Sequence, residues 1–502
     1  MRRDKRENRF KQEGTKLKKF TRVWSILYLI LMVAFAAVLV YMNLLPLKLL
    51  AAVGVGLLII TLLIFPAMFS TRFKKSRRIL CLVISIIMMI VYGVGIAYMA
   101  GTIDFMGTIS KLGQETEDYH VIVKKDSPYT EIDQINGKTV QTYLTNDINY
   151  SDAKAQLKDK EGVEYEMIED LSSLSEGMTR GDYEIIFISA AQYKSICDEH
   201  QDFEEGTKIL YTVKVVIESS DISKNVDVTK EPFNMYISGL DVEGTIDVTS
   251  RSDVNMLLTV NPVTHKILLT SIPRDYLIKL KGKGDATDKL THTGLYGIEE
   301  TISSVEDLLG IDINYYTKVN YTTVKTFVDA IGGIDVDSDY TFTTSGMAKE
   351  GLSGITFYEG ENHLDGSRAL AFARERHSFA DGDNQRVKNQ QKIVKAIIKK
   401  GTSSTTILTK YSSILNSIED YIKINMSQKE MQSLIKMQLD SMPGWDIETQ
   451  DLEGVGITGQ VVYSLGEAWP CWAMGPNDES IIKCVDKIVE TMETSAQEDS
   501  AA

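Results

Sequence analysis

The chain has 502 residues, of which 69 are acidic and 54 basic, and its formal net charge at pH 7 is −15. This length allows about three folded units, and the ordinary glycine, proline and aromatic content excludes collagen-like and low-complexity chains. The acidic balance argues against nucleic acid as a partner, because phosphate binding needs a basic surface.

Three uncharged apolar runs lie within the first hundred residues, at 24–42, 49–69 and 79–99. Each is about 20 residues long, which is the length that a helix needs to cross a membrane. Ten Lys and Arg residues precede the first run and five lie between the second and third, so residues 1–22 and the loop 70–78 are expected to stay in the cytoplasm. We therefore predict a multi-pass protein of the cell membrane, with a basic cytoplasmic tail at 1–22, three transmembrane helices within 23–102 and an extracellular remainder.

A small α/β accessory domain with a linker is predicted for residues 103–231. Strand-like runs at 119–123, 139–144, 183–188 and 209–216 alternate with helical stretches at 152–157 and 172–180. Residues 217–231 are polar and are expected to form the linker. The order of the elements is similar to one lobe of an extracellular solute-binding protein.

A second α/β unit, with a central sheet flanked by helices, is predicted for residues 232–400. Apolar runs indicate strands at 235–240, 255–260, 266–272, 315–319 and 334–336, and helices at 296–309, 323–331, 367–376 and 389–400. We expect residues 401–502 to be a helical extension with helices at 411–424, 426–439 and 480–492 and a frayed end. The GxGxxG sequence at 454–459 is expected to be a loop, because no strand, turn and helix unit surrounds it.

The four cysteines are too few for a fold built on disulfides. Cys471 and Cys484 are separated by twelve residues in the exported tail, where a disulfide is chemically possible. A disulfide between them and two free buried thiols both remain open. The six histidines are not spaced as zinc ligands.

Several charged residues lie at the predicted ends of strands and helices. Asp241 follows the run at 235–240, Asp253 precedes the strand at 255–260, and Arg274 and Asp275 follow the strand at 266–272. Further charged and polar residues surround the helix at 367–376 and the loop after it: Arg374, Arg376, Asp383, Arg386 and Gln390. Arginine forks suit bidentate phosphate contacts, and a few carboxylates bind Mg²⁺ while leaving positions for phosphate oxygens. The set predicts a pyrophosphate clamp.

Residues 235–396 resemble the catalytic domain of the LytR-CpsA-Psr family. The similar segments are, in order, GLD, TSRSDVNMLLTVNP, ILLTSIPRDYLI, DKLTHTG, FVDAIGGIDV, HLDGSRALAFARER and DGDNQRVKNQQ. The three apolar runs and the accessory domain resemble the branch that attaches capsule. The resemblance implies transfer of a glycopolymer, either capsular polysaccharide or a teichoic-acid-like polymer, from undecaprenyl pyrophosphate to peptidoglycan outside a Gram-positive membrane. The implied partners are polyprenyl-pyrophosphate-linked glycopolymer, peptidoglycan and membrane lipid.

The resemblance also implies roles for individual residues. The magnesium ligands fall on Asp241 and Asp253, and the pyrophosphate-binding arginines fall on Arg274, Arg374, Arg376 and Arg386, with Gln390 as a polar partner. Supporting roles fall on Arg251, Asp275 and Lys289, and Asp383 is a candidate general base by position. Asn389 stands where many members have arginine, which removes one expected phosphate contact.

Two other functions remain open. A hydrolase that cleaves the lipid pyrophosphate with water would use the same clamp, and a sensor that binds lipid or solute without catalysis would use the accessory domain. The charge distribution constrains each of them, because residues 1–102 carry +13 and the remainder of the chain carries −28. An anionic ligand is repelled by such an exterior, so its site must be a local cluster of cations, and a metal ion would assist it.

Overall fold

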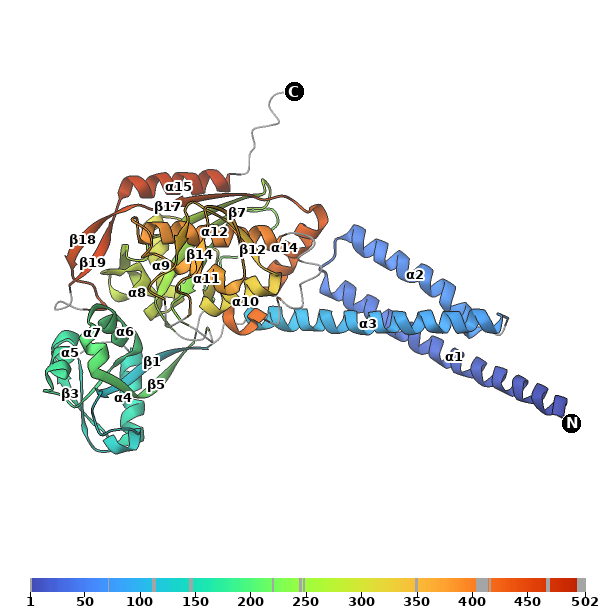
Figure 1. Cartoon of the computed structure of the whole chain (residues 1–502), viewed down its shortest axis with the longest axis horizontal. Helices are drawn as coiled ribbons and strands as arrows, with labels where there is room; N and C mark the ends of the chain where they lie inside the picture. The colour runs from blue at the N-terminus through green and yellow to red at the C-terminus, as the bar shows by residue number, and fades with distance from the viewer. Residues whose placement is uncertain are drawn as a thin grey trace, which may run out of the picture. The chain divides into compact units, whose positions relative to one another are not determined.

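A computed structural model describes residues 2–493, apart from residues 71, 111–113, 144–147, 219–220, 243–245, 247–248, 348–350, 403–413, 415–416 and 466–469. The described residues form two units. The frayed end that the sequence predicts at the last ten residues lies almost entirely outside them, as does part of the helix predicted at 411–424. Figure 1 shows the helices and strands with the labels used below.

The first unit contains the long N-terminal helices α1 (Arg2–Met42), α2 (Leu47–Phe69) and α3 (Lys75–Ile109), together with α14 (Gln428–Ser441). Within these helices, Thr15–Met42, Leu47–Phe69 and Lys75–Ile109 are long and apolar enough to cross a membrane. Many of their large apolar side chains are exposed, including Ile30 and Leu62. Such surfaces are unfavourable in water and favourable in lipid, so the structure has three apolar helices where the sequence predicts membrane spans, and these helices suggest a membrane anchor.

The second unit begins with the accessory domain, which is built on a mixed five-stranded sheet in the order β3-β2-β4-β1-β5. Its strands are β1 (Gln114–Lys124), β2 (Thr139–Tyr143), β3 (Glu164–Ile168), β4 (Ile185–Ser189) and β5 (Thr207–Glu218). Its helices are α4 (Ile148–Glu161), α5 (Leu171–Arg180), α6 (Ala190–Glu199) and α7 (Gln201–Gly206). The expected alternation is present. Strand β3 was missed because its sequence, EYEMI, is mostly polar and partly exposed.

The larger domain of this unit is built on a six-stranded sheet in the order β16-β11-β6-β7-β8-β17. The four inner strands are β6 (Phe233–Leu240), β7 (Ser252–Asn261), β8 (Lys266–Ser271) and β11 (Tyr315–Asn320). Strand β7 pairs antiparallel with β6 on one side and with β8 on the other, and β11 pairs parallel with β6. All four inner strands correspond to runs that the sequence predicted.

Helices cover both faces of this sheet. On one face, α9 (Ile298–Leu309) and α15 (Asp478–Met492) place Ile302, Val305 and Ile488 in one apolar cluster with Tyr236 and Leu257 of the sheet. On the other face, α12 (Asp383–Gly401) packs on β8 and is joined to α11 (Gly366–Arg374), which in turn contacts α10 (Tyr321–Ile331). The domain is therefore a three-layer α/β structure, as the sequence predicts.

Shorter elements connect these layers. They are β9 (Leu277–Leu280), β10 (Ala286–Lys289), α8 (Leu290–Thr293), β12 (Ile334–Ser338), β13 (Phe342–Thr343), β14 (Thr356–Phe357) and β15 (Gly360–Leu364). Strands β9 and β10 form a two-stranded sheet, as do β12 and β15.

The prediction of a helical extension at 401–502 is incomplete: α14 and α15 lie where helices are predicted at 426–439 and 480–492, but the described residues of this segment also form four strands. Strands β16 (Ile422–Ile424) and β17 (Asp446–Asp451) form the two edges of the six-stranded sheet. The GxGxxG segment is strand β18 (Gly454–Gln460), paired with β19 (Cys471–Pro476). These strands were missed because β16 has three residues, β17 is largely polar and β18 is rich in glycine, which is depleted in strands. The second unit thus continues past residue 400.

The contact between α10 and α11 depends on Gly366. Its backbone N–H donates to Asp329 Oδ1 at 2.8 Å, and a Cβ at this position would collide with the backbone oxygen of Lys325. We expect Gly366→Ala to lower the free energy of unfolding by about 1–3 kcal/mol, because α11 must move away from α10. Denaturant unfolding of the full-length protein in detergent measures the change. Gly401→Ala is the matched control, since a Cβ there has nothing within 4 Å; equal stabilities of the two variants would contradict the prediction.

Candidate functional site

The predicted site residues converge because four strands of the central sheet end or begin at one edge. This edge is formed by the ends of the strands and not by the outer strands β16 and β17. Antiparallel pairing places the end of β6 beside the start of β7, and the end of β8 beside that same start. Strand β11, which runs parallel to β6, ends there as well. The residues at these positions are Asp241, Asp253, Arg274 and Tyr321, so the pairing of the sheet alone brings together two carboxylates, a guanidinium and a phenol.

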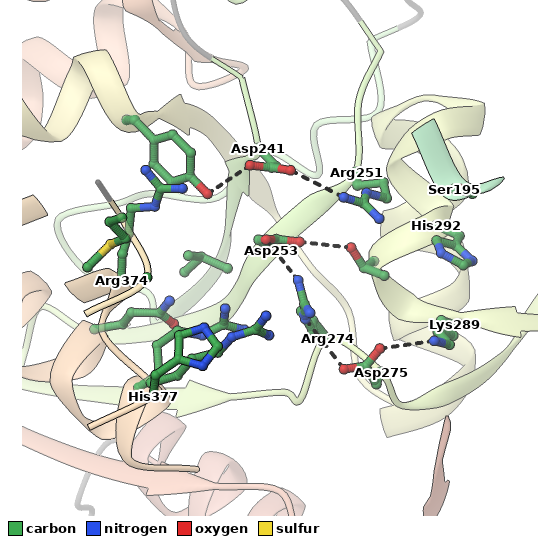
Figure 2. A pocket seen from close by; sticks show the side chains of 18 of the residues that line it. Ser195, Asp241, Arg251, Asp253, Arg274, Asp275, Lys289, His292, Arg374 and His377 are labelled. Atoms are coloured by element: carbon green, nitrogen blue, oxygen red, sulfur yellow. Dashed lines mark hydrogen bonds and ion pairs between the residues drawn. The ribbon is translucent and has the colours of Figure 1, made fainter. Parts of the chain in front are cut away.

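A cavity of about 390 Å³ lies at this edge. Its charged lining comprises Arg251, Arg274, Arg374, Arg376, Arg386 and Lys289, against Asp241, Asp253 and Asp275. Figure 2 shows Lys289 and His292 on one side of the cavity and Arg374 and His377 on the opposite side, with Asp253 and Arg274 between them. The excess of three cations gives a local positive site in an otherwise acidic part of the chain.

Asp241 is held by three side chains. Tyr321 donates its hydroxyl to Oδ1 at 2.9 Å, and Arg251 Nη2 lies 3.3 Å from Oδ2. Lys194, on α6 of the accessory domain, also contacts Oδ2 and donates to the backbone oxygen of Asp241 at 3.1 Å. The contact between Lys194 and Asp241 could not be predicted, because the two residues belong to different predicted domains.

Asp253 and Arg274 form the central ion pair of the cavity. Arg274 Nη1 donates to Asp253 Oδ2 at 2.9 Å, and its Nε lies 3.4 Å from Asp275 Oδ2. Burial on its own would raise the pKa of Asp253, but Arg274 and then Arg251 outweigh it and lower that pKa. Burial would likewise lower the pKa of Arg274, and the carboxylates of Asp253 and Asp275 reverse this effect. Both members of the pair are therefore ionised, and Lys289 Nζ, 3.4 Å from Asp275 Oδ1, extends the network.

The remaining arginines come from the layer of helices. Arg374 ends α11 and lies over the Tyr321 ring, 4.2 Å from its centroid. Between Arg374 and the exposed Arg376 lies the fully buried Glu375, whose carboxylate accepts the backbone N–H groups of Ser345 and Ser378 at 2.7 and 2.9 Å. Glu375 thus fixes the segment that carries both arginines, although nothing in the sequence distinguished it from other acidic residues.

Helix α12 supplies Arg386 and Gln390, which are both buried and line the cavity. Asp383, one turn earlier, does not line it; its Oδ1 lies 2.6 Å from Arg386 Nη2. Burial lowers the pKa of Arg386, and Asp383 opposes this effect. Asn389, at the position where an arginine was expected from the resemblance, is buried and its amide lies 3.4 Å from the backbone oxygen of Phe372, away from the cavity.

Tyr321, His292 and His377 also line the cavity, and the sequence analysis did not name them. Tyr321 comes two residues after the strand predicted at 315–319 and directly follows β11, so attention to residues just past strand ends could have found it. His292 and His377 carried no signal, because no metal-ligand spacing or apolar pattern marks them. The possible disulfide between Cys471 and Cys484 is absent: neither forms a disulfide, and they lie in separate apolar clusters.

Comparison with known proteins identifies the family to which this fold and cavity belong. A model of the LytR_cpsA_psr family matches residues 188–468. The chain belongs to the LytR-CpsA-Psr family. The match includes every residue assigned above to the cavity and extends past residue 400, in agreement with the edge strands β16 and β17.

Two curated relatives in the LytR-CpsA-Psr family are named polyisoprenyl-teichoic acid–peptidoglycan teichoic acid transferase TagU. The protein of Bacillus mycoides is 36% identical over 216 residues, which is 43% of this chain and 66% of the relative, so this chain spans slightly less than two thirds of it. The protein of Bacillus subtilis is 32% identical over 280 residues, or 52% of this chain and 83% of the relative. A crystal structure of B. subtilis TagU superposes with a TM-score of 0.40 and 27% identity, covering 53% of this chain and 98% of that chain.

The ligands that this LytR-CpsA-Psr cavity offers suit a Mg²⁺ ion that also binds phosphate oxygens. Among the described residues, no group of three or more His, Cys, Asp or Glu side chains could enclose a metal ion. Asp241 and Asp253 instead offer two hard carboxylates beside a cationic cavity, and Mg²⁺ is often bound by one or two carboxylates and the oxygens of a phosphate substrate. The residues fit a metal ion that arrives with its phosphate ligand.

The ion pair of Asp253 and Arg274 predicts a pH dependence of stability. The lowered pKa of Asp253 means that its contribution is present above the unfolded value of about 4 and is lost as the pH falls toward the folded value. We expect Asp253→Asn to reduce the free energy of unfolding by about 3 kcal/mol at pH 7, because Arg274 then loses a buried partner. Denaturant unfolding at pH 7 and pH 3 measures this, with the exposed Asp381→Asn as the control. A pH-independent difference from the wild type would contradict it.

Proposed function

We propose that this protein transfers a glycopolymer from polyprenyl pyrophosphate to peptidoglycan at the outer face of a Gram-positive membrane, with Mg²⁺ as cofactor. The observation that carries the proposal is the excess of three cations in a cavity whose two strand-end carboxylates suit a metal ion. The printed names of the TagU relatives support a teichoic acid as one class of polymer. The three apolar helices support an anchor beside a lipid-linked donor.

The cavity residues would bind the diphosphate and stabilise charge as its bridging bond breaks. Arg274, Arg374 and Arg386 lie on three different elements, so they can contact different oxygens of one diphosphate. Charge that develops on the bridging oxygen during the transfer is stabilised by donors fixed in advance, and no nucleoside triphosphate is needed because the pyrophosphate is already activated. Bound Mg²⁺ would supply further charge neutralisation at the phosphate oxygens.

The orientation that we propose places the basic segments at 1–22 and 70–78 in the cytoplasm and the second unit outside. Lys and Arg residues concentrate in these two segments, while the short connection at 43–48 has Lys48 as its only charge. The wall polymers and peptidoglycan that this reaction joins are found on that outer side.

Arg376 gives a direct test, because its side chain is exposed and its loss leaves no cavity in the core. We expect Arg376→Ala to lower the transfer rate about 100-fold, the size of effect seen when one preorganised donor is removed. The assay uses the full-length protein in proteoliposomes, polyprenyl-pyrophosphate-linked glycan and peptidoglycan, and measures glycan bound to peptidoglycan. Lys388→Ala, on α12 but outside the cavity, is the control. Release of free glycan at an equal rate without peptidoglycan would favour a hydrolase and overturn the transferase.

The magnesium assignment predicts a distinct pattern in the carboxylate variants. Asp241→Asn and Asp253→Asn should each require a higher free Mg²⁺ concentration for half-maximal transfer, and chelation should abolish transfer by the wild type. Asp275→Asn is the matched control, since this carboxylate lines the same cavity but is paired with Arg274 and Lys289. Titration of the transfer rate against Mg²⁺ distinguishes them, and a response to Mg²⁺ that is the same in all three variants would exclude Asp241 and Asp253 as ligands.

A further inference from the structure

A buried polar cluster adjoins the cavity behind Lys289 and Thr291. Asp288, at the end of β10, is fully buried, and His292 on α8 and Ser464 are nearly so. Asp288 Oδ1 lies 2.7 Å from His292 Nδ1 and accepts the Ser464 hydroxyl at 3.0 Å. Its Oδ2 accepts the backbone N–H of Ser464 at 2.9 Å and the hydroxyl of Tyr296 at 3.4 Å. A carboxylate with this many donors is held in one orientation.

These contacts determine where the imidazole of His292 carries its proton. An ionised carboxylate can only accept, so the 2.7 Å contact with Asp288 Oδ1 requires a hydrogen on Nδ1. Ser464 Oγ, 2.7 Å from the same nitrogen, already donates its hydrogen to Asp288. In the neutral ring, the lone pair is therefore on Nε2, at the opposite corner of the imidazole.

The Nε2 atom is available to the cavity. His292 belongs to the cavity lining (Figure 2), and its Nδ1 edge is turned to the buried Asp288 and Ser464. Nothing in the described part of the chain forms a hydrogen bond with Nε2. A ring with one nitrogen fixed by a buried carboxylate and the other free toward a substrate cavity has the arrangement of a general base.

The other candidate bases in or near the cavity are less suitable. Asp383 lies outside the lining and contacts Arg386. Asp275 is already engaged in ion pairs with Arg274 and Lys289. His377 is exposed, and no hydrogen bond to another described residue orients its ring.

We propose that His292 is the general base of the transfer reaction, with Asp288 and Ser464 as positioning residues; this rests on the proposed function above. The acceptor is a sugar hydroxyl of peptidoglycan. Its oxygen forms a bond to the phosphorus that carries the glycan, and the bond from this phosphorus to the bridging oxygen breaks. The bridging oxygen leaves with the electron pair on the lipid phosphate, and the hydroxyl proton passes to Nε2 of His292.

The test separates this role from a structural one. Asparagine at position 292 can place an amide N–H where Nδ1 lies, so His292→Asn keeps the donor to Asp288 and removes only the basic nitrogen. We expect kcat for transfer by the full-length protein in proteoliposomes to fall at least about 100-fold. The KM for the lipid-linked donor, the binding of farnesyl diphosphate used as a probe, and the unfolding midpoint should stay within twofold or a few degrees of the wild type.

Asp288→Asn provides a second variant with its own readout. Its amide can donate to Nδ1, which would move the ring proton to Nε2 and leave no lone pair toward the cavity, so kcat should fall with KM unchanged. His363→Asn is the matched control, because this exposed histidine also pairs with a carboxylate through Nδ1 but lies outside the cavity, and it should retain near wild-type kcat. Retention of kcat by His292→Asn, or its loss together with probe binding or thermal stability, would overturn the assignment.

The activity of the wild type distinguishes failure of the proposed transferase function from failure of the His292 proposal. If the wild type passes the glycan to water instead of peptidoglycan, the proposed transferase function fails. The rates of hydrolysis by the same variants still test His292, because the attacking water must also lose a proton. A wild type with neither activity would overturn both.

Discussion

Mutual repulsion among cations is the constraint on which the site depends. Five arginines and one lysine line a cavity of about 390 Å³, and they remain there because Asp241, Asp253 and Asp275 lie among them. The paired carboxylates compensate only part of the charge, so the cavity keeps an excess that a diphosphate can neutralise. Ion pairs such as Asp253 with Arg274 reduce the repulsion, and binding of such a ligand would reduce it further.

Because the charged groups must be held close together, the sheet and the helices each supply part of the set. The sheet edge supplies Asp241, Asp253 and Arg274 in a fixed relation, because backbone pairing sets their spacing. The helix layer supplies Arg374 and Arg386 through side chains that reach the edge from the other side. Gly366 keeps α11 close to α10, and Glu375 fixes the segment after α11. Gly366 and Glu375, which do not line the cavity, thus help to determine where the cationic groups lie.

The sequence was most informative about site residues that lie directly beside an apolar run. Apolar runs located the inner strands and with them the charged residues at their ends, Asp241, Asp253 and Arg274. The charged residues around the helix predicted at 367–376 included Arg374, Arg376 and Arg386, the resemblance to the family implied their role, and all three line the cavity. The edge strands β16 and β17 were missed because a polar or very short strand lacks the alternating pattern that marks a half-buried one. Ser464 lies 172 residues after His292, and no local pattern can predict such a contact.

The position of β17 has a consequence for the biogenesis of the protein. Its residues 446–451 complete one edge of the sheet, and α15 further along the chain supplies Cys484 and Ile488 to the core beneath β7. A domain that begins near residue 233 therefore lacks both its last strand and a covering helix until almost the whole polypeptide has left the ribosome. If the second unit, which begins at Ile109, is extracellular, about 380 residues must cross the membrane before Ile488 can complete this core, and the cationic cavity forms only late in that process.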